Sequence, residues 1–138
     1  MNQLIEQAQR MSRRDLGAWG EKCAETYLRA NDYRILDRNW RGCGGELDIV
    51  AYDPQREAVV AVEVKTRRAC TLGIVSTGTP EEAIIPVKLA RLRSLIGQWC
   101  MGVGAARLQA EVRNIAVDVV GVVVHADQYS VNHVKDVQ

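Results

Sequence analysis

The stretch GELDIVAYDPQREAVVAVEVKTR, residues 45–67, decides the fold because it contains two apolar runs joined by a short polar segment. Residues 46–52 alternate between apolar and polar side chains and residues 58–67 are rich in valine, so both runs predict β-strands. The segment between them, residues 53–57, contains the aspartate and proline typical of turns. We therefore predict an antiparallel β-hairpin.

The register of this hairpin determines which charged residues meet. If Asp53 pairs with Ala58, Asp48 lies directly opposite Glu63. Two carboxylates opposed across neighbouring strands have Cβ atoms roughly 5 Å apart, and they repel each other unless a cation lies between them. Carboxylate oxygens suit Mg²⁺ and Mn²⁺, so the hairpin predicts a divalent metal site.

Lys65 lies two residues after Glu63, on the same face of the strand. Beside a metal it would polarise the attacking water or neutralise charge that develops on a phosphate. A second interpretation stays open, in which Asp48, Glu63 and Lys65 are ordinary solvated strand residues and a Glu–Lys pair is worth a few tenths of a kcal/mol. The choice depends on the register, because a shift of one residue turns Asp48 to the other face.

Apolar spacing along the rest of the chain predicts the elements around the hairpin. A first helix is expected over residues 15–30, with Asp15 as its N-cap. A capping box at residues 79–82 starts a second helix, which Pro86 kinks or restarts and which ends near Cys100, before two glycines. Two further strands are expected over residues 33–40 and 113–124.

The order helix, three strands, helix, strand predicts an α/β sandwich around a mixed sheet. All 138 residues are expected to form one domain, residues 1–138. Within it, residues 1–13 are an N-terminal extension and residues 125–138 are a C-terminal tail.

Composition excludes several classes of protein. Hydrophobic residues make up 47% of the chain and charged residues 25%, as in soluble globular proteins, and the longest apolar run, residues 119–124, is too short to span a membrane. The 4 cysteines form no close pair of the kind zinc sites use, the 2 histidines lie beside no suitable nucleophile, and no Walker or dinucleotide motif occurs. Because the start of the chain is polar and offers no signal peptide core, we expect the protein in the cytoplasm.

Several segments match the motifs of a known family. They are GAWGEKCAETYL (residues 17–28), RNWR (residues 38–41), GELDIVA (residues 45–51), VEVKTR (residues 62–67) and VDVV (residues 117–120). Over roughly residues 14–122 the chain resembles the YraN family, also called UPF0102, of small bacterial proteins. That family is similar to the restriction-endonuclease-like superfamily of PD-(D/E)xK nucleases, which includes archaeal Holliday junction resolvases. The resemblance implies an α-β-β-β-α-β core.

The resemblance also implies roles for individual residues. Asp48 and Glu63 match the acidic metal ligands of the superfamily motif. Lys65 matches its catalytic lysine, and Glu21 matches a first-helix acid that helps to hold the metal or a water. For Glu21, a solvent-facing helical glutamate remains the alternative. Where the family has an Arg-aromatic-Asp run, this chain has alanine two residues before Asp118, so we expect a structural role for that aspartate.

Basic residues around this centre are candidates for binding nucleic-acid phosphates. The chain uses 14 arginines and only 4 lysines, and arginine is preferred where planar contact with phosphate matters. The alternative is that these residues only make the surface soluble. The candidates are Arg41, Arg67, Lys88 and Arg91.

We therefore expect a Mg²⁺- or Mn²⁺-dependent endonuclease that acts on structured or branched DNA, in repair or recombination, with no membrane partner. A resolvase needs two active sites, so the resemblance also suggests a homodimer. The competing hypotheses are a non-catalytic nucleic-acid-binding or protein-interaction adaptor that retains the nuclease fold, and a purely structural protein. Divalent metal binding should be absent from the purely structural protein.

Overall fold

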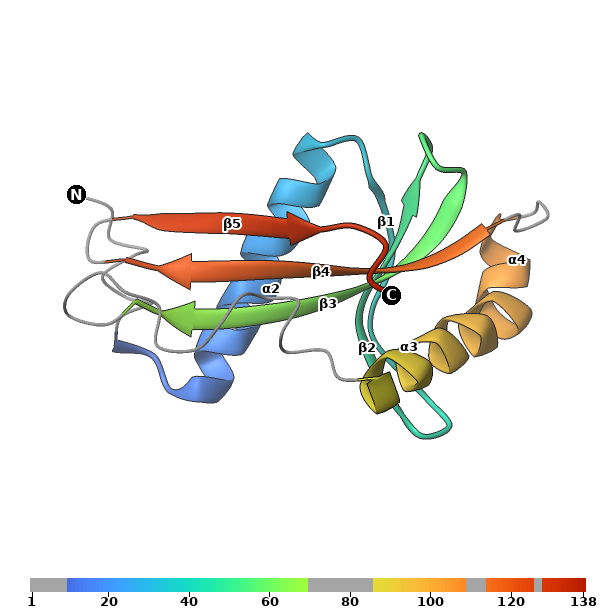
Figure 1. Cartoon of the computed structure of the whole chain (residues 1–138), viewed down its shortest axis with the longest axis horizontal. Helices are drawn as coiled ribbons and strands as arrows, with labels where there is room; N and C mark the ends of the chain where they lie inside the picture. The colour runs from blue at the N-terminus through green and yellow to red at the C-terminus, as the bar shows by residue number, and fades with distance from the viewer. Residues whose placement is uncertain (1–9, 70–85, 109–113, 126–127) are drawn as a thin grey trace.

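A computed structural model of the chain describes residues 10–69, 86–108, 114–125 and 128–138. In these ranges no helix is both long and apolar enough to cross a membrane. The elements in chain order (Figure 1) are α2 (Arg13–Ala30), β1 (Arg34–Gly42), β2 (Gly45–Asp53), β3 (Ala58–Arg68), α3 (Pro86–Trp99), the π-helical turn η2 (Cys100–Gly104), α4 (Ala105–Leu108), β4 (Asn114–Val124) and β5 (Tyr129–Val134).

The strands form one five-stranded sheet in the order β1-β2-β3-β4-β5. β3 and β4 are parallel, and every other pair of neighbours is antiparallel. The predicted mixed sheet and the predicted order of elements are both confirmed. β5 is an addition, because it lies within residues 125–138, where the sequence predicts only a tail. Its residues, YSVNHV, are mostly polar and lie at the sheet edge, so they give little of the apolar alternation that marks a strand.

β3 is buried on both faces, which makes the fold a sandwich. On one face Val60 and Val62 pack with Leu28 of α2, and on the other face Val59 packs with Trp99 of α3. Because helices cover both faces, the strand needs no polar alternation, and it reads as the run of valines seen in the sequence. Each helix contributes one buried stripe to this core: Leu16, Gly20, Ala24 and Leu28 from α2, and Leu92, Leu95, Ile96 and Trp99 from α3.

The start of α2 differs from the prediction. Ser12, not Asp15, is the N-cap, and its hydroxyl accepts a hydrogen bond from the backbone amide of Asp15 at 3.2 Å. A serine side chain at this position satisfies an amide that has no partner within the helix. Asp15 lies instead in the first turn, where a negative charge is favourable beside the positive end of the helix dipole.

The end of α3 also differs from the prediction. The glycines after Cys100 do not end the helical region, because the chain continues through η2 and α4. Gly104 packs so closely against Trp99 that an added Cβ would lie 2.5 Å from the indole ring, so this glycine serves a close contact instead of a helix stop. The capping box at residues 79–82 lies outside the described residues.

The hairpin has the predicted register. Asp53 pairs with Ala58, and the ladder between β2 and β3 continues in the same register to Ile49 and Val62. It ends there, one residue before Asp48 would meet Glu63 across the strands. The two carboxylates therefore belong to a place where β2 and β3 part, and not to a regular ladder.

Candidate active site

Asp48 lies at an irregular point of β2. On the β1 side, Arg38 pairs with Ile49 and Trp40 pairs with Leu47, and no pair joins Asn39 to Asp48. Asn39 has a left-handed backbone with φ of 47°, a conformation that asparagine tolerates better than most residues.

On the β3 side, the Asp48 carboxylate replaces the missing ladder contact. Its Oδ2 atom accepts a hydrogen bond from the backbone amide of Val64 at 2.9 Å. This bond fixes the direction of the carboxylate at the point where the two strands part. Local sequence therefore places an acid with a defined orientation at the edge of the core.

Glu63 is nearly buried, with 8% of its surface exposed, and it is paired with two lysines. Its Oε1 atom lies 3.5 Å from Nζ of Lys65 on the same strand and 3.0 Å from Nζ of Lys88 on α3. The sequence predicts Lys88 as a phosphate contact, whereas the structure places its ammonium against Glu63. No sequence signal indicates this contact, because it depends on how α3 docks on the sheet.

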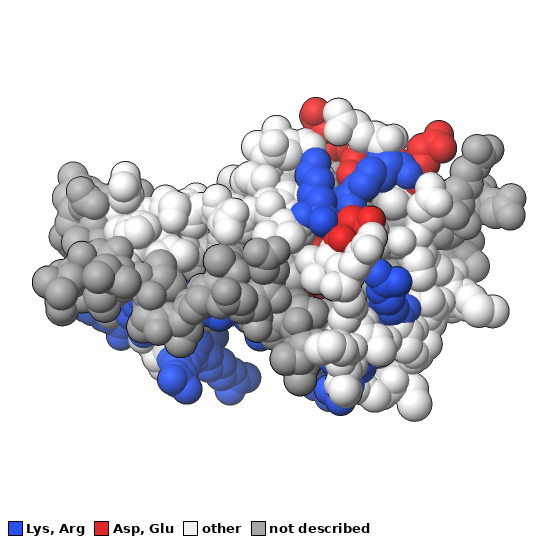
Figure 2. Space-filling model, in the orientation of Figure 1, with Lys and Arg blue, Asp and Glu red and all other residues white. Residues whose placement is uncertain are grey.

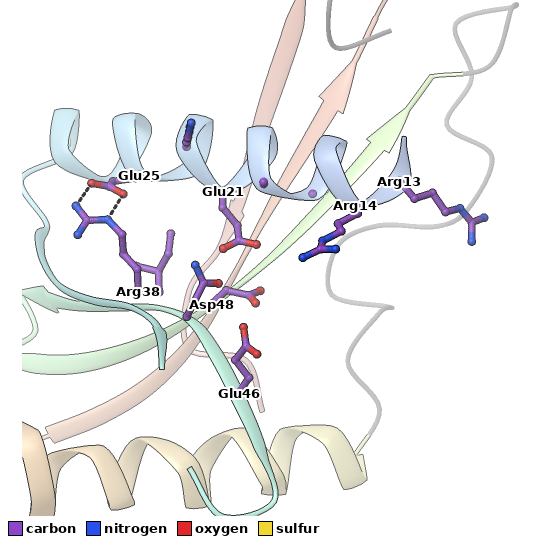
Figure 3. Close-up of a pocket in the computed structure, with 12 residues that line it drawn as sticks. Arg13, Arg14, Glu21, Glu25, Arg38, Glu46 and Asp48 are labelled. Atoms are coloured by element: carbon purple, nitrogen blue, oxygen red, sulfur yellow. Dashed lines mark hydrogen bonds and ion pairs between the residues drawn. The ribbon is translucent and has the colours of Figure 1, made fainter. Parts of the chain in front are cut away.

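Glu21 reaches the site from the opposite side, on α2. The preceding residue, Gly20, allows the helix to approach β3 closely, because a Cβ there would lie only 1.8 Å from Oγ1 of Thr66. Figure 3 shows the Glu21 side chain directed from α2 toward Asp48, with Glu46 of β2 on the same side. The predicted site residues Glu21 and Asp48 therefore line one pocket, with a volume of about 730 Å³, between α2, β1 and β2.

Around Glu21 and Asp48, the electrostatics of this pocket show repulsion between neighbouring carboxylates. Burial, followed by the charges of Asp48, Glu46 and Glu63, raises the pKa of Glu21 to about 7. Burial and the charge of Glu63 raise the pKa of Asp48 to about 6, although the amide of Val64 and the charge of Lys65 act the other way. Burial and the neighbouring Lys88 lower the pKa of Lys65. A cation in the pocket would relieve the repulsion between the carboxylates.

The donor set fits a hard divalent cation in its chemistry. Glu21, Asp48 and Glu63 offer only carboxylate oxygens, which Mg²⁺ and Mn²⁺ prefer. In the described part of the chain, however, no group of His, Cys, Asp or Glu side chains is already gathered closely enough to hold a metal ion. Binding would therefore require these side chains to draw together and Glu63 to exchange lysine contacts for the metal.

The other predicted basic residues have different surroundings. The Arg41 guanidinium donates to Glu46 at 3.1 Å and is largely exposed, Arg91 is exposed on α3, and Arg67 is half-buried on β3. Four of the described residues that line the Glu21–Asp48 pocket are basic: Arg13, Arg14 and Lys22 of α2 and Arg38 of β1. Arg38, which with Arg41 flanks Trp40, is among the arginines that the sequence offers for binding phosphates, whereas the three residues of α2 were missed. Their spacing from Glu21 along the helix is the signal that could have found them.

Asp118 lies apart from the pocket, in a buried network. Its carboxylate accepts hydrogen bonds from Arg56, Tyr33, His133 and the amide of Asp136. Burial alone would raise the pKa of Asp118, but the bonds from His133 and Arg56 lower it to about 2. With both oxygens occupied by protein donors, Asp118 has the structural role that the sequence predicts.

The geometry defines a class of protein: an α/β sandwich with carboxylates and lysines gathered where two strands of its sheet part. Within that class, the model of the uncharacterised protein family UPF0102 matches residues 20–122, so the chain belongs to this family. A UPF0102 protein of Beutenbergia cavernae is 40% identical over 123 residues, covering 88% of this chain and 94% of the relative. One from Kineococcus radiotolerans is 43% identical, covering 74% and 80%. One from Mycobacterium avium is 45% identical, covering 81% and 80%.

Proposed function

We propose that this protein is a Mg²⁺- or Mn²⁺-dependent nuclease that hydrolyses phosphodiester bonds in structured or branched DNA. One observation carries the proposal: Asp48 leaves the ladder where β2 and β3 part, and Glu63 and Lys65 follow directly on β3. Carboxylates beside a lysine are the groups needed to hold a divalent cation and a phosphate together.

The residues of this cluster have distinct chemical roles. Glu21, Asp48 and Glu63 would hold the cation, which when bound supplies Lewis-acid activation of a phosphate and of a water. Lys65 provides a positive charge for a phosphate on which negative charge develops. If Glu21 holds a water instead of the cation, its pKa of about 7 suits it to accept a proton from that water near neutral pH.

The order of these residues also supports the proposal. Asp48 followed by Glu63-Val64-Lys65 matches the aspartate and the (D/E)xK run of the restriction-endonuclease-like nucleases, and we propose that the chain is a resolvase-like member of them. A substrate with two strands to cut would need two copies of the site, so the proposal includes a homodimer on DNA. It also places the protein in the cytoplasm, with the DNA.

One observation favours a second candidate function. Glu63 forms ion pairs with both Lys65 and Lys88, as expected in a protein that keeps the fold without the chemistry. Such a protein would be a nucleic-acid-binding or protein-interaction adaptor. It would bind its partner equally well with and without divalent ions.

A cleavage assay separates the two functions. Linear, flapped and four-way DNA substrates are incubated with wild type and Lys65→Ala, in Mg²⁺ and in Mn²⁺. We expect wild type to cut the branched substrates and Lys65→Ala to cut them on the order of 100-fold more slowly, as when one preorganised electrostatic group is lost. Lys135→Ala removes an exposed lysine outside the pocket and should cut like wild type.

The same gels, with a binding lane for each substrate, give the contrary outcomes. Wild type that binds these DNAs but cuts none with either metal would support the adaptor. Wild type that neither binds nor cuts would favour a protein-interaction role. A Lys65→Ala variant that cuts at the wild-type rate would remove Lys65 from the chemistry.

A further inference from the structure

The Glu21–Asp48 pocket has two zones of charge. Glu21, Glu46 and Asp48 are directed toward one another from α2 and β2, whereas Arg13 and Arg14 extend from the first turns of α2 (Figure 3). Figure 2 shows basic side chains gathered at the lower left, near the start of α2 in Figure 1, away from the mixed acidic and basic cluster at the upper right. The pocket therefore has cations at the start of α2 as well as the group of carboxylates.

The cations of the pocket are not equivalent. Arg38 is held by Glu25 through a pair of hydrogen bonds, drawn as dashed lines in Figure 3, so its charge is already matched. Arg13, Arg14 and Lys22 are exposed, and their side chains have no ion pair or hydrogen bond with any residue that the structure describes. We name these three residues the α2 rim. Within the described part of the chain, nothing neutralises their charges, which suits them to bind an anion from outside the protein.

Gly17 lies on the pocket wall between the α2 rim and Glu21. A glycine inside a helix costs about 1 kcal/mol relative to alanine, so both glycines of α2 lower the stability of an isolated helix. Gly20 allows the close contact with Thr66, but a Cβ at Gly17 would meet no atom within 4 Å. Gly17 therefore leaves the helix surface bare beside the pocket, where an extended ligand can approach the backbone.

The pocket lining also limits the kind of ligand. Among the described residues that line it there is no aromatic ring on which a base could stack, and the three residues of the α2 rim add positive charge beside the carboxylates. Contacts of this type hold the phosphates of a chain and carry no sequence information.

We infer that the α2 rim binds the sugar–phosphate backbone of one DNA strand and leads it past Gly17 toward the carboxylates, without reading its sequence. The inference rests on the proposed function and adds a substrate-binding surface to it. This surface lies on α2, whereas the predicted basic residue Lys88 lies on α3, where the structure pairs it with Glu63.

Fluorescence anisotropy of labelled oligonucleotides tests this surface in EDTA, where no strand is cut. Replacing all three residues of the α2 rim with glutamine should weaken binding to single-stranded DNA about tenfold or more at low salt, and should lower the slope of log affinity against log salt by about 2. Two unrelated base sequences should be affected equally. The matched control removes the same charge from exposed residues outside the pocket: Arg34, Arg93 and Lys135 to glutamine.

A bulky substitution at Gly17 tests whether the DNA strand passes along the surface of α2. Among the described residues, no atom beyond the backbone of α2 itself and the two chain neighbours of Gly17 lies within 4 Å of a Cβ built there. Gly17→Leu should therefore keep the fold while its side chain covers the helix surface beside the pocket. We expect binding to fall in Gly17→Leu as it does in the rim variant. Gly17→Ala, which adds one carbon, should bind DNA within about twofold of wild type and should melt slightly higher, as expected for a helical glycine.

The outcomes distinguish this inference from the proposed function. If wild type cuts branched DNA but the rim variant binds DNA like wild type, the α2 rim does not bind DNA and the proposed nuclease activity is supported. If the rim variant loses DNA binding but wild type never cuts, DNA binding by the α2 rim is supported and the proposed nuclease activity is wrong. A loss of binding confined to RNA oligonucleotides, or binding of an acidic peptide but of no oligonucleotide, would overturn the assignment to DNA.

Discussion

At the scale of single residues, the distinctive feature is a nearly buried glutamate that is paired with two lysines. Oε1 of Glu63 lies within ion-pair distance of Lys65 and Lys88, so both lysines compete with a cation for this carboxylate. Lys65 belongs to the proposed chemistry, so Lys88 is the lysine whose removal should favour the metal.

Removing Lys88 should therefore strengthen metal binding. We predict that Lys88→Gln binds Mn²⁺ about fivefold more tightly, since a partly buried ion pair of about 1 kcal/mol no longer competes. Isothermal titration calorimetry measures this affinity, with Lys135→Gln as the control for lost charge. Weaker binding in Lys88→Gln would show that Lys88 supports the site instead of competing for it.

Asp118 makes the free energy of unfolding depend on pH in the opposite direction from Glu21 and Asp48, because its pKa is lowered while theirs are raised. Its pKa is lowered to about 2 in the folded protein, so between that value and about pH 4 the folded protein binds fewer protons than the unfolded chain. Its contribution to the free energy of unfolding is thus present above about pH 4 and is lost as the pH falls toward 2. That contribution is about 2 kcal/mol.

We predict that Asp118→Asn flattens the acid limb of the stability curve. It should also destabilise the protein by about 3–5 kcal/mol at neutral pH, because it removes a charge partner of the partly buried Arg56. Urea titrations from pH 2 to pH 7 measure both effects. An acid limb as steep as that of wild type would show that other carboxylates, such as Asp53, dominate it.

At the scale of elements, the position of α2 depends on one glycine. Gly20 is in contact with Thr66 of β3, whereas Gly17, one turn earlier, faces open space. The same substitution at the two positions should therefore have opposite effects. The contrast distinguishes Gly20, which is needed for the packing of α2 on β3, from Gly17, which leaves the surface of α2 uncovered beside the pocket.

We predict that Gly20→Ala lowers the free energy of unfolding by about 1–3 kcal/mol through overpacking. In the same urea titration, Gly17→Ala should be neutral or raise it by up to about 1 kcal/mol. Gly20→Ala should also slow cleavage, because it moves Glu21 away from Asp48. Equal stability of the two variants would contradict the close approach of α2 to β3.

The elements that the sequence predicts are those with a strong local signal. Three features can be recognised in the sequence: the buried valine run of β3, the apolar stripe of α3 and the turn at residues 53–57. The register of the hairpin follows from the turn. Edge strand β5 lacks such a signal, since three of its six residues are exposed and none is fully buried. Contacts between elements could not be predicted from the sequence either. The Lys88–Glu63 pair and the Gly20–Thr66 contact depend on how the helices dock on the sheet.

At the scale of the whole molecule, the metal should contribute to stability. Glu21 and Asp48 have raised pKa values, so between about pH 4 and pH 7 the metal-free protein binds more protons than the unfolded chain and loses stability as the pH rises. A divalent cation offsets this repulsion and binds only the folded state.

We predict that millimolar Mn²⁺ raises the melting temperature, more at pH 7 than at pH 5, and that the gain vanishes in Glu63→Gln. Differential scanning fluorimetry measures the melting temperature with and without Mn²⁺ at each pH. A melting curve indifferent to Mn²⁺ would count against the site, and an equal response in Glu63→Gln would place the metal elsewhere.

The central claim is that Asp48 and Glu63 hold one divalent cation at the point where β2 and β3 part. Anomalous diffraction from a crystal soaked in Mn²⁺ tests it most directly. We predict a manganese peak in contact with both carboxylates, with Lys88 displaced from Glu63. A map with no peak between them, and with both lysines still on Glu63, would contradict the claim.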